Sequence, residues 1–285
     1  MNNSTHQRYS ADTQGFGDMS RQMNKFAINN VLPKTFNDKA LPVLYNSWEA
    51  TEFDVNSKNQ TALAEIAAKI GVELFVMDDG WFGKRNNDKA GLGDWFINKE
   101  KFPNGLDELI NKVNDLGMDF GIWVEPKMVN RDSDLYRAHP DWAYHFDKRY
   151  SCELRNQLVL NMTREDVQEY IFNCLNDLLS NHRIKYVKWD MNRPFSEVGA
   201  ENLDCPQMLW YLHTKAVYDI VDRLKALHPD TALKAVLQAE AEQTMVLLCT
   251  MTWYGPVTTP TALTVWSYRR VIHSSDQSKQ WCLGY

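Results

Sequence analysis

Carboxylates, a lysine and tryptophans stand at the ends of several short apolar segments of this sequence. Asp78 and Asp79 follow one such segment, Trp123 lies near the end of the next, and Lys188 and Asp190 close a third. Carboxylates accept hydrogen bonds from sugar hydroxyls and can attack or protonate a glycosidic bond, while indole rings stack on pyranose faces. This combination of residue types is typical of a carbohydrate site.

Each of these residues also has a purely structural interpretation. The Asp-Asp-Gly at 78–80 could form a tight turn, because Asp and Gly favour such connections. Trp123 could belong to the core. Lys188 and Asp190 lie two positions apart on an expected strand, so their side chains share a face and could form a structural ion pair. It is their joint occurrence at several strand ends that favours a site.

Short apolar runs alternate along the chain with segments of helical periodicity. The expected strands cover 42–48, 73–79, 119–126, 158–162 and 184–190, and the expected helices cover 60–70, 106–116, 165–180 and 207–227. This βαβ order predicts an α/β fold with a parallel sheet, which fits a doubly wound sheet or a TIM-type (β/α)8 barrel. No GxGxxG follows a strand, and the polar strand ends would meet at the mouth of a barrel. We therefore predict an incomplete TIM-type barrel with about five βα units.

Composition and charge exclude several classes of partner. The 285 residues are 44% hydrophobic with a net charge of −6 and no basic cluster, so we expect no nucleic-acid partner. No apolar run reaches the roughly 18 to 20 residues that span a bilayer, and the first residues lack a signal core, so we expect a cytoplasmic protein without a membrane partner. The five cysteines have no metal-type spacing and are expected to be free thiols.

Seven motifs, in this order, carry a resemblance to a known family. They are PVLYNSWEATEFD, VMDDGWFGKRN, GDWFINKEKFPNGL, GIWVEPKMVN, HPDW, RNQLVLN and KYVKWDMNR. Their order and spacing resemble those of glycoside hydrolase family 36, the microbial α-galactosidases, over about residues 15 to 230. The resemblance implies a retaining hydrolase that cleaves terminal α-D-galactosyl residues from oligosaccharides by double displacement, with no metal or organic cofactor.

The resemblance also implies roles for individual residues. Asp190, the acid of KWDMNR, matches the family nucleophile, and Lys188 matches the lysine beside it. Asp78 and Asp79 match the pair that binds the galactose O4 and O6 hydroxyls. Further substrate-binding positions are Trp48, Trp123, Arg155 and Asn192.

Two positions within the matched region depart from the family pattern. Lys127 stands in EPKMV where the family commonly has a glutamate, and Asn161 stands in LVLN where an aspartate is frequent. We expect each to reduce activity without removing a catalytic role.

The third departure is the run from Gln243 to Ser275, which contains none of the 37 acidic residues. The family places a glycine-rich turn and a TSDNTD-like motif with the general acid/base in this part of the chain. When the DNA is read one base earlier, each new codon consists of the last base of one codon and the first two bases of the next. The genetic code then requires Gly from Met245 and the residue after it, and Asp from Met251 and the residue after it. The remaining codons permit both family motifs. We therefore expect residues after about 231 to be an out-of-frame translation.

These observations predict three parts: a lead-in segment at 1–40, a partial catalytic barrel at 41–230 and an out-of-frame tail at 231–285. The chain as written would lack the acid/base and strands six to eight, and we expect it to be inactive. The alternatives are a galactosyltransferase of the raffinose-synthase type, or a non-catalytic galactoside-binding remnant or pseudogene product. The expected partner is an α-galactoside oligosaccharide, and family members often form homo-oligomers.

Overall fold

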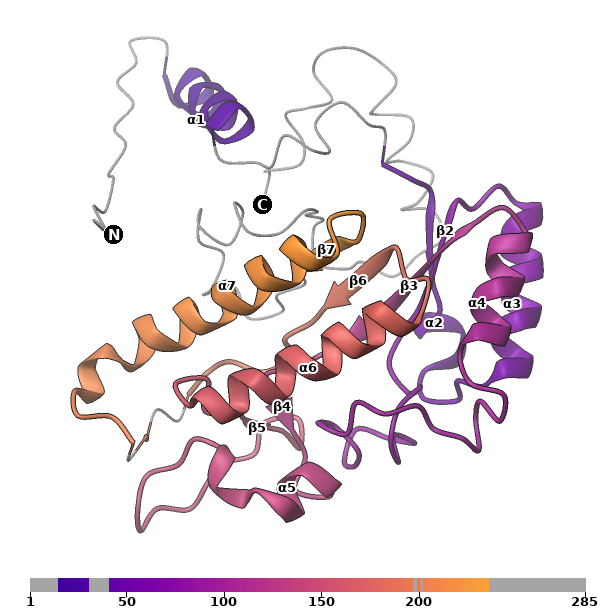
Figure 1. The fold of residues 1–285 in the computed structure, drawn as a ribbon. Helices are drawn as coiled ribbons and strands as arrows, with labels where there is room; N and C mark the ends of the chain where they lie inside the picture. Colours follow the sequence, from indigo (N-terminus) through magenta and orange to yellow (C-terminus); the bar gives the residue numbers. More distant parts are fainter. Residues whose placement is uncertain (1–14, 31–40, 197–198, 201, 236–285) are drawn as a thin grey trace.

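A five-stranded parallel sheet forms the centre of the molecule (Figure 1). The computed structural model describes residues 15–30, 41–196, 199–200 and 202–235. The strand order is β1-β2-β3-β6-β7, and every neighbouring pair is parallel. The strands span Leu44–Asn46 (β1), Leu74–Met77 (β2), Asp119–Val124 (β3), Tyr186–Trp189 (β6) and Ala232–Ala235 (β7).

Helices connect consecutive strands of this sheet. Figure 1 shows α3 beside α4, and α6 beside α7. The longer helices are Phe16–Asn30 (α1), Ser57–Lys69 (α3), Asp107–Asp115 (α4), Glu165–Asn181 (α6) and Leu209–Leu227 (α7), and the short ones are Trp48–Thr51 (α2) and Asp134–Ala138 (α5). The four helices predicted from periodicity correspond to α3, α4, α6 and α7, so those predictions are confirmed.

Local sequence explains where these helices begin and which face they bury. Asn56 caps α3, since its side chain accepts a hydrogen bond from the backbone N–H of Asn59. In α6 the buried residues Val167, Ile171 and Leu175 recur every four positions and face the sheet. The apolar stripe therefore determines how the helix packs.

The two faces of the sheet bury different residues. Phe75, Met77 and Ile122 belong to the large cluster that includes the helices, whereas Leu74 and Tyr186 belong to a small separate cluster. Because side chains alternate along a strand, even-numbered residues of β2 and β6 point to the small-cluster side. That side corresponds to the interior of a barrel.

One predicted strand lies elsewhere. The apolar run at 158–162 does not enter the sheet: β5 (Leu158–Val159) pairs antiparallel with β4 (Met128–Val129) in the excursion between β3 and α6. Its residues are buried because this excursion packs on the core. A buried run of this kind is as apolar as a central strand of a sheet. The prediction that 158–162 is a parallel sheet strand was wrong.

A strand that we did not predict, β7, forms the edge of the described sheet opposite β1. β7 pairs with β6 in the register Tyr186↔Ala232. It lies in the segment 231–285, where no further strand was expected. The rest of that segment, including the expected out-of-frame motifs, lies outside the described residues.

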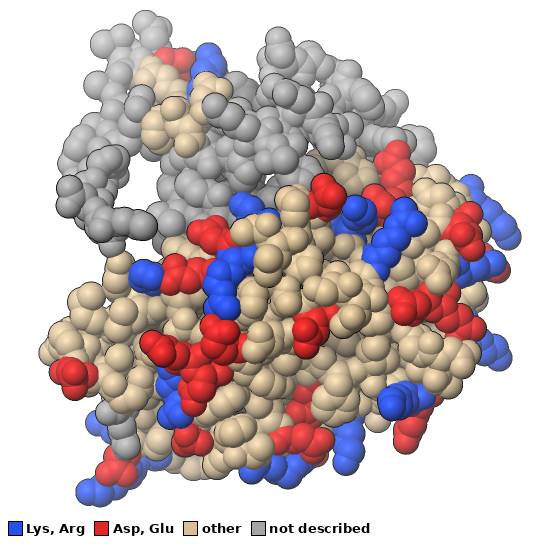
Figure 2. All heavy atoms as spheres, viewed as in Figure 1, with Lys and Arg blue, Asp and Glu red and all other residues tan. Residues whose placement is uncertain are grey.

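Charged side chains are interspersed on the surface. Figure 2 shows acidic and basic residues side by side over the face that it presents. None of the helices that the structure describes combines the length and apolar character needed to cross a membrane.

Candidate active site

A cavity of about 290 Å³ lies at the carboxyl ends of β2, β3 and β6. All eight side chains predicted to act on the substrate line it: Trp48, Asp78, Asp79, Trp123, Arg155, Lys188, Asp190 and Asn192. The remaining lining residues are Glu49, Phe53, Arg85, Asp88 and Gln157. The carboxyl ends of parallel strands are the usual place for an active site in α/β folds.

Asp190 follows the last residue of β6 and is held by backbone and side-chain hydrogen bonds. Its N–H donates to the carbonyl of Val124 at 2.8 Å, which extends the β3–β6 pairing by one step. Its Oδ2 accepts from Trp123 Nε1 at 2.9 Å and from Asn192 Nδ2 at 3.0 Å, and its Oδ1 accepts from Met191 N at 2.8 Å. Three donors therefore fix the orientation of a carboxylate that is only 6% exposed.

Lys188 pairs with Asp78 across the sheet, and not with Asp190. Its Nζ lies 2.7 Å from Asp78 Oδ2, which also accepts from Asn46 Nδ2 at 2.5 Å. Burial works to lower the pKa of Lys188, but the charges of Asp78 and Asp190 outweigh burial and raise that pKa. Lys188 is thus a half-buried cation that is bonded to Asp78 and also influenced by the charge of Asp190. The structural ion pair considered from sequence spacing involves another aspartate.

Asp79 forms a buried pair with Arg85, which sequence reasoning missed. Arg85 Nε lies 2.9 Å from Asp79 Oδ1, and Nη2 lies 2.8 Å from Oδ2. Arg85 Nη1 also donates to Asn130 Oδ1 at 3.0 Å. Burial raises the pKa of Asp79, although the charge of Arg85 acts in the opposite direction. Arg85 stands in the quoted DDGWFGKR motif, so an arginine six residues after the acid pair was the available signal.

Glu125 is fully buried and is connected to Asp190 through hydrogen bonds with Asn192. Its Oε2 accepts from Gln157 Nε2 at 2.9 Å, and its Oε1 accepts from the backbone N–H of Asn192. Burial, followed by the charge of Asp190, raises the pKa of Glu125 to about 8. Glu125 stands in the quoted motif GIWVEPKMVN, but we assigned it no role from the sequence.

Trp48 and Arg155 form part of the rim of the cavity. The backbone N–H of Trp48 donates to Asn46 Oδ1 at 2.9 Å, and its ring meets Phe53 edge-on. Arg155 Nη1 lies 3.3 Å from Asn192 Oδ1, and its backbone has a φ of 53°. Arg155 is thereby directed toward the turn that carries the catalytic candidate.

Trp123 is both a core residue and a residue of the cavity, the two interpretations that the sequence left open. It is 2% exposed and stacks on Phe82 with ring centroids 6.1 Å apart, as a core residue would. Its indole N–H nevertheless reaches Asp190. Core packing therefore fixes the donor that orients the carboxylate.

The two departures from the family pattern lie outside the cavity lining. Lys127 Nζ contacts Met191 Sδ at 3.2 Å in a buried position. Asn161 donates to Asn202 Oδ1 at 2.8 Å and accepts from Thr163 N at 3.1 Å. Neither side chain forms a wall of the cavity around Asp190.

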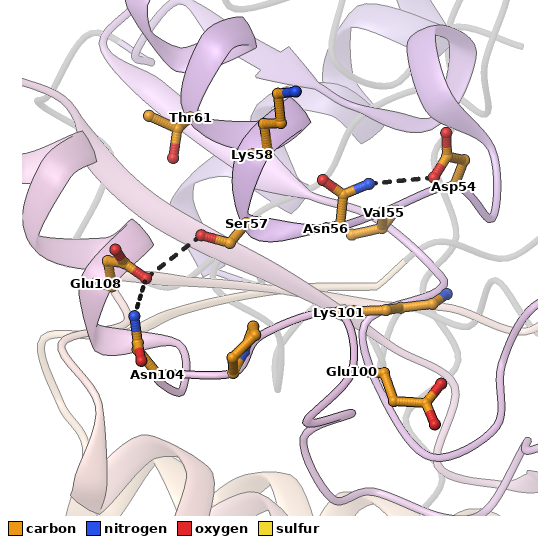
Figure 3. A pocket seen from close by; sticks show the side chains of 11 residues that line it. Asp54, Val55, Asn56, Ser57, Lys58, Thr61, Glu100, Lys101, Asn104 and Glu108 are labelled. Atoms are coloured by element: carbon orange, nitrogen blue, oxygen red, sulfur yellow. Dashed lines mark hydrogen bonds between the residues drawn. The ribbon is translucent and has the colours of Figure 1, made fainter.

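A larger and more open hollow of about 770 Å³ lies between the start of α3 and the loop before α4 (Figure 3). Its polar groups are largely bonded to one another: Ser57 Oγ lies 3.5 Å and Asn104 Nδ2 3.2 Å from Glu108 Oε2. Lys101 Nζ is bound by the backbone carbonyls of Phe53, Gly80 and Arg85 at 2.7–3.0 Å. No row of strand-end carboxylates meets there, so we place the chemistry in the smaller cavity.

Strand-end carboxylates at the carboxyl edge of a parallel, helix-covered sheet characterise the (β/α)8-barrel glycoside hydrolases. Within the described residues no group of three His, Cys, Asp or Glu side chains is arranged to hold a metal ion. The family model of Melibiase matches residues 4–255, and the chain belongs to this family.

Individual relatives agree with the family match. The chain is 44% identical over 218 residues to alpha-galactosidase AgaA of Geobacillus stearothermophilus, an alignment that covers 76% of this chain and 30% of that protein. Solved structures of variants of AgaA include one in complex with stachyose (TM-score 0.77, 39% identity, 82% of this chain and 33% of that chain). Another is in complex with 1-deoxygalactonojirimycin (TM-score 0.79, 40% identity, 84% and 33%). These are structures of family 36 proteins, and the present sheet corresponds to an incomplete part of their catalytic barrel. The chain spans about a third of the length of the relatives it matches.

Proposed function

We propose that this chain carries the galactose-binding part of an α-galactosidase active site, with Asp190 as the nucleophile. The observation that carries the proposal is the cavity in which Asp190, held by Trp123 and Asn192, faces the Asp78–Lys188 pair. The relative from Geobacillus stearothermophilus is named an alpha-galactosidase, and the ligand in one of its structures is stachyose. The proposed substrates are therefore oligosaccharides with terminal α-D-galactosyl residues.

In the proposed reaction, Asp190 attacks the anomeric carbon of the galactosyl unit. A bond forms between a carboxylate oxygen and that carbon as the glycosidic C–O bond breaks, and water then hydrolyses the galactosyl ester. Asp78 and Asp79 accept hydrogen bonds from the O4 and O6 hydroxyls, and Lys188 donates to a hydroxyl. An acceptor pair at the axial O4 would select galactose over glucose.

The proton donor for the leaving group is a separate part of the proposal. Glu125 is fully buried and does not line the cavity, so we do not assign it the role of proton donor. We infer that the acid/base is absent from this chain as written, because the sequence has no TSDNTD-like motif, in which the family places that residue. Its loss would lower the rate by about 10² to 10⁴-fold for substrates with poor leaving groups, and less for activated aryl galactosides.

The test combines ligand binding with turnover in the full chain. Calorimetric titration with 1-deoxygalactonojirimycin and with its gluco epimer measures selectivity, and release of p-nitrophenol from p-nitrophenyl α-galactoside measures turnover. We expect selective binding of the galacto inhibitor, and slow aryl-galactoside cleavage that Asp190→Asn abolishes while binding persists. Selective binding with no turnover would indicate a galactoside-binding protein, and no binding of either inhibitor would refute the proposal.

A further inference from the structure

Glu125 is a carboxyl group in a place where a charge has little to stabilise it. It is completely buried, and among the described residues no lysine or arginine forms an ion pair with it. Its hydrogen-bond donors include the backbone N–H of Asn192 and the amide of Gln157. The hydrogen bonds from Asn192 act to lower the pKa of Glu125 but do not outweigh burial. A buried ionised carboxylate without a cation is costly, whereas a neutral carboxylic acid with hydrogen bonds is not.

The charged groups that face Glu125 make ionisation still less favourable. The carboxylates of Asp190, after β6, and Asp79, after β2, both act on it and both raise its pKa. Lys188 is bonded to Asp78, and the Lys127 ammonium, two residues further along the chain, contacts Met191. Two carboxylates thus act on Glu125, and the nearby lysines are bonded to other groups.

The amide of Gln157 supplies an acceptor for a proton on Glu125. Gln157 is 3% exposed, and in the orientation described its Oε1 has no hydrogen-bond partner. Oxygen and nitrogen of an amide are nearly equal in size, so the group fits equally well when turned by 180°. In that orientation the carbonyl oxygen takes the position 2.9 Å from Glu125 Oε2, where it accepts an O–H. The oxygen is then satisfied, and the amide N–H groups take the position in which the oxygen had no partner.

Glu125 also supports the turn that carries the nucleophile candidate. Its Oε1 accepts the backbone N–H of Asn192, and the side chain of Asn192 donates to Asp190 Oδ2 at 3.0 Å. We propose that Glu125 is a positioning residue that works as a neutral carboxylic acid, holding the Asp190–Asn192 turn while leaving Asp190 the negative charge beside it. Its importance for turnover rests on the proposed function of Asp190; its protonation does not.

Three variants of the full chain separate this role from a charged one. Glu125→Gln keeps the side-chain shape, the acceptor for Asn192 and a donor for Gln157. The affinity for 1-deoxygalactonojirimycin at pH 7 is therefore expected to stay within about threefold of that of the unmodified protein. Glu125→Leu removes the acceptor and leaves a buried N–H unsatisfied, which is expected to weaken binding about tenfold or more. Glu125→Asp keeps the acid but shortens its reach and is expected to fall between them. Equal losses in the Gln and Leu variants would overturn the proposal.

Infrared difference spectroscopy tests the protonation without any sugar. The unmodified protein is expected to show the C=O stretch of a protonated carboxyl above about pH 6, where ordinary glutamates are ionised, and the band is expected to be missing in Glu125→Gln. Absence of the band in the unmodified protein would overturn the proposal even if the Gln variant fails to fold. If no galactoside binds but the band is present, the proposed function fails and the neutral state of Glu125 stands.

Discussion

Replacing Arg85 by methionine tests the importance of its buried pair with Asp79. The two side chains are 3% and 6% exposed and share a bidentate hydrogen bond, and methionine fills much of the arginine stem without its charge. Breaking a buried pair by removing one partner typically destabilises a protein by about 3–5 kcal/mol, because the other charge remains buried and unpaired. We expect a loss of this size for Arg85→Met at pH 7.

Urea denaturation followed by tryptophan fluorescence measures the effect. Without Arg85 the folded-state pKa of Asp79, already raised by burial, rises further, so the deficit of the variant should shrink as the pH falls and Asp79 takes up a proton. The double variant Asp79→Asn, Arg85→Met should lose less than the sum of the single variants. Arg137→Met, which breaks exposed pairs with Asp132 and Asp134, is the control and should have little effect. A loss below about 1 kcal/mol, or strict additivity, would refute the reasoning.

Three further predictions concern the sheet and the cavity. Lys188→Met leaves Asp78 without its cation and should weaken binding of 1-deoxygalactonojirimycin roughly tenfold to a hundredfold by calorimetry; a change below about twofold would contradict the assigned pair. Gly121→Ala places a Cβ 2.7 Å from Tyr186 Cδ1 and should cost about 1–3 kcal/mol in urea denaturation, whereas an unchanged midpoint would show that the ring can yield. Glu125 has a folded pKa raised to about 8, so the stability it contributes is full below about pH 4.3 and is lost as the pH rises to about 8, by at most about 1.4 kcal/mol per pH unit. Urea midpoints measured against pH should show this slope in the unmodified protein and a smaller one in Glu125→Gln.

The fold could be predicted from sequence where periodicity and burial agree. The apolar stripe of α6 fits only a helix packed on a sheet. The buried run of β2 fits a strand covered on both faces. The run at 158–162 has the same apolar character but lies in the excursion after β3, and composition does not distinguish these places. β7 was missed because we expected the chain to leave the family pattern at about 231.

The members of the site could be predicted, but their pairing could not. Strand alternation and parallel order bring Asp78 and Lys188 to one edge, which is enough to place them in one cavity. That Lys188 bonds across the sheet to Asp78 depends on the strand order, which places only β3 between β2 and β6. Arg85 returns to Asp79 through the course of the intervening turn. Such bonds are set by three-dimensional geometry that residue spacing does not encode.

The attachment of Asp190 to the sheet has a consequence for altering the protein by directed evolution. Its backbone N–H is tied to Val124, so its position is inherited from strand pairing. The rim depends on side chains instead, since Asn130 Nδ2 donates to the carbonyl of Asn156 at 2.7 Å and Asn156 Nδ2 donates to Asp88 at 3.0 Å. A library randomised in the largely exposed segment 146–154, which precedes the cavity-lining Arg155, would vary the approach to the cavity while Asp190 stays in place. The side chains around the cavity and the position of Asp190 are thus separately mutable traits.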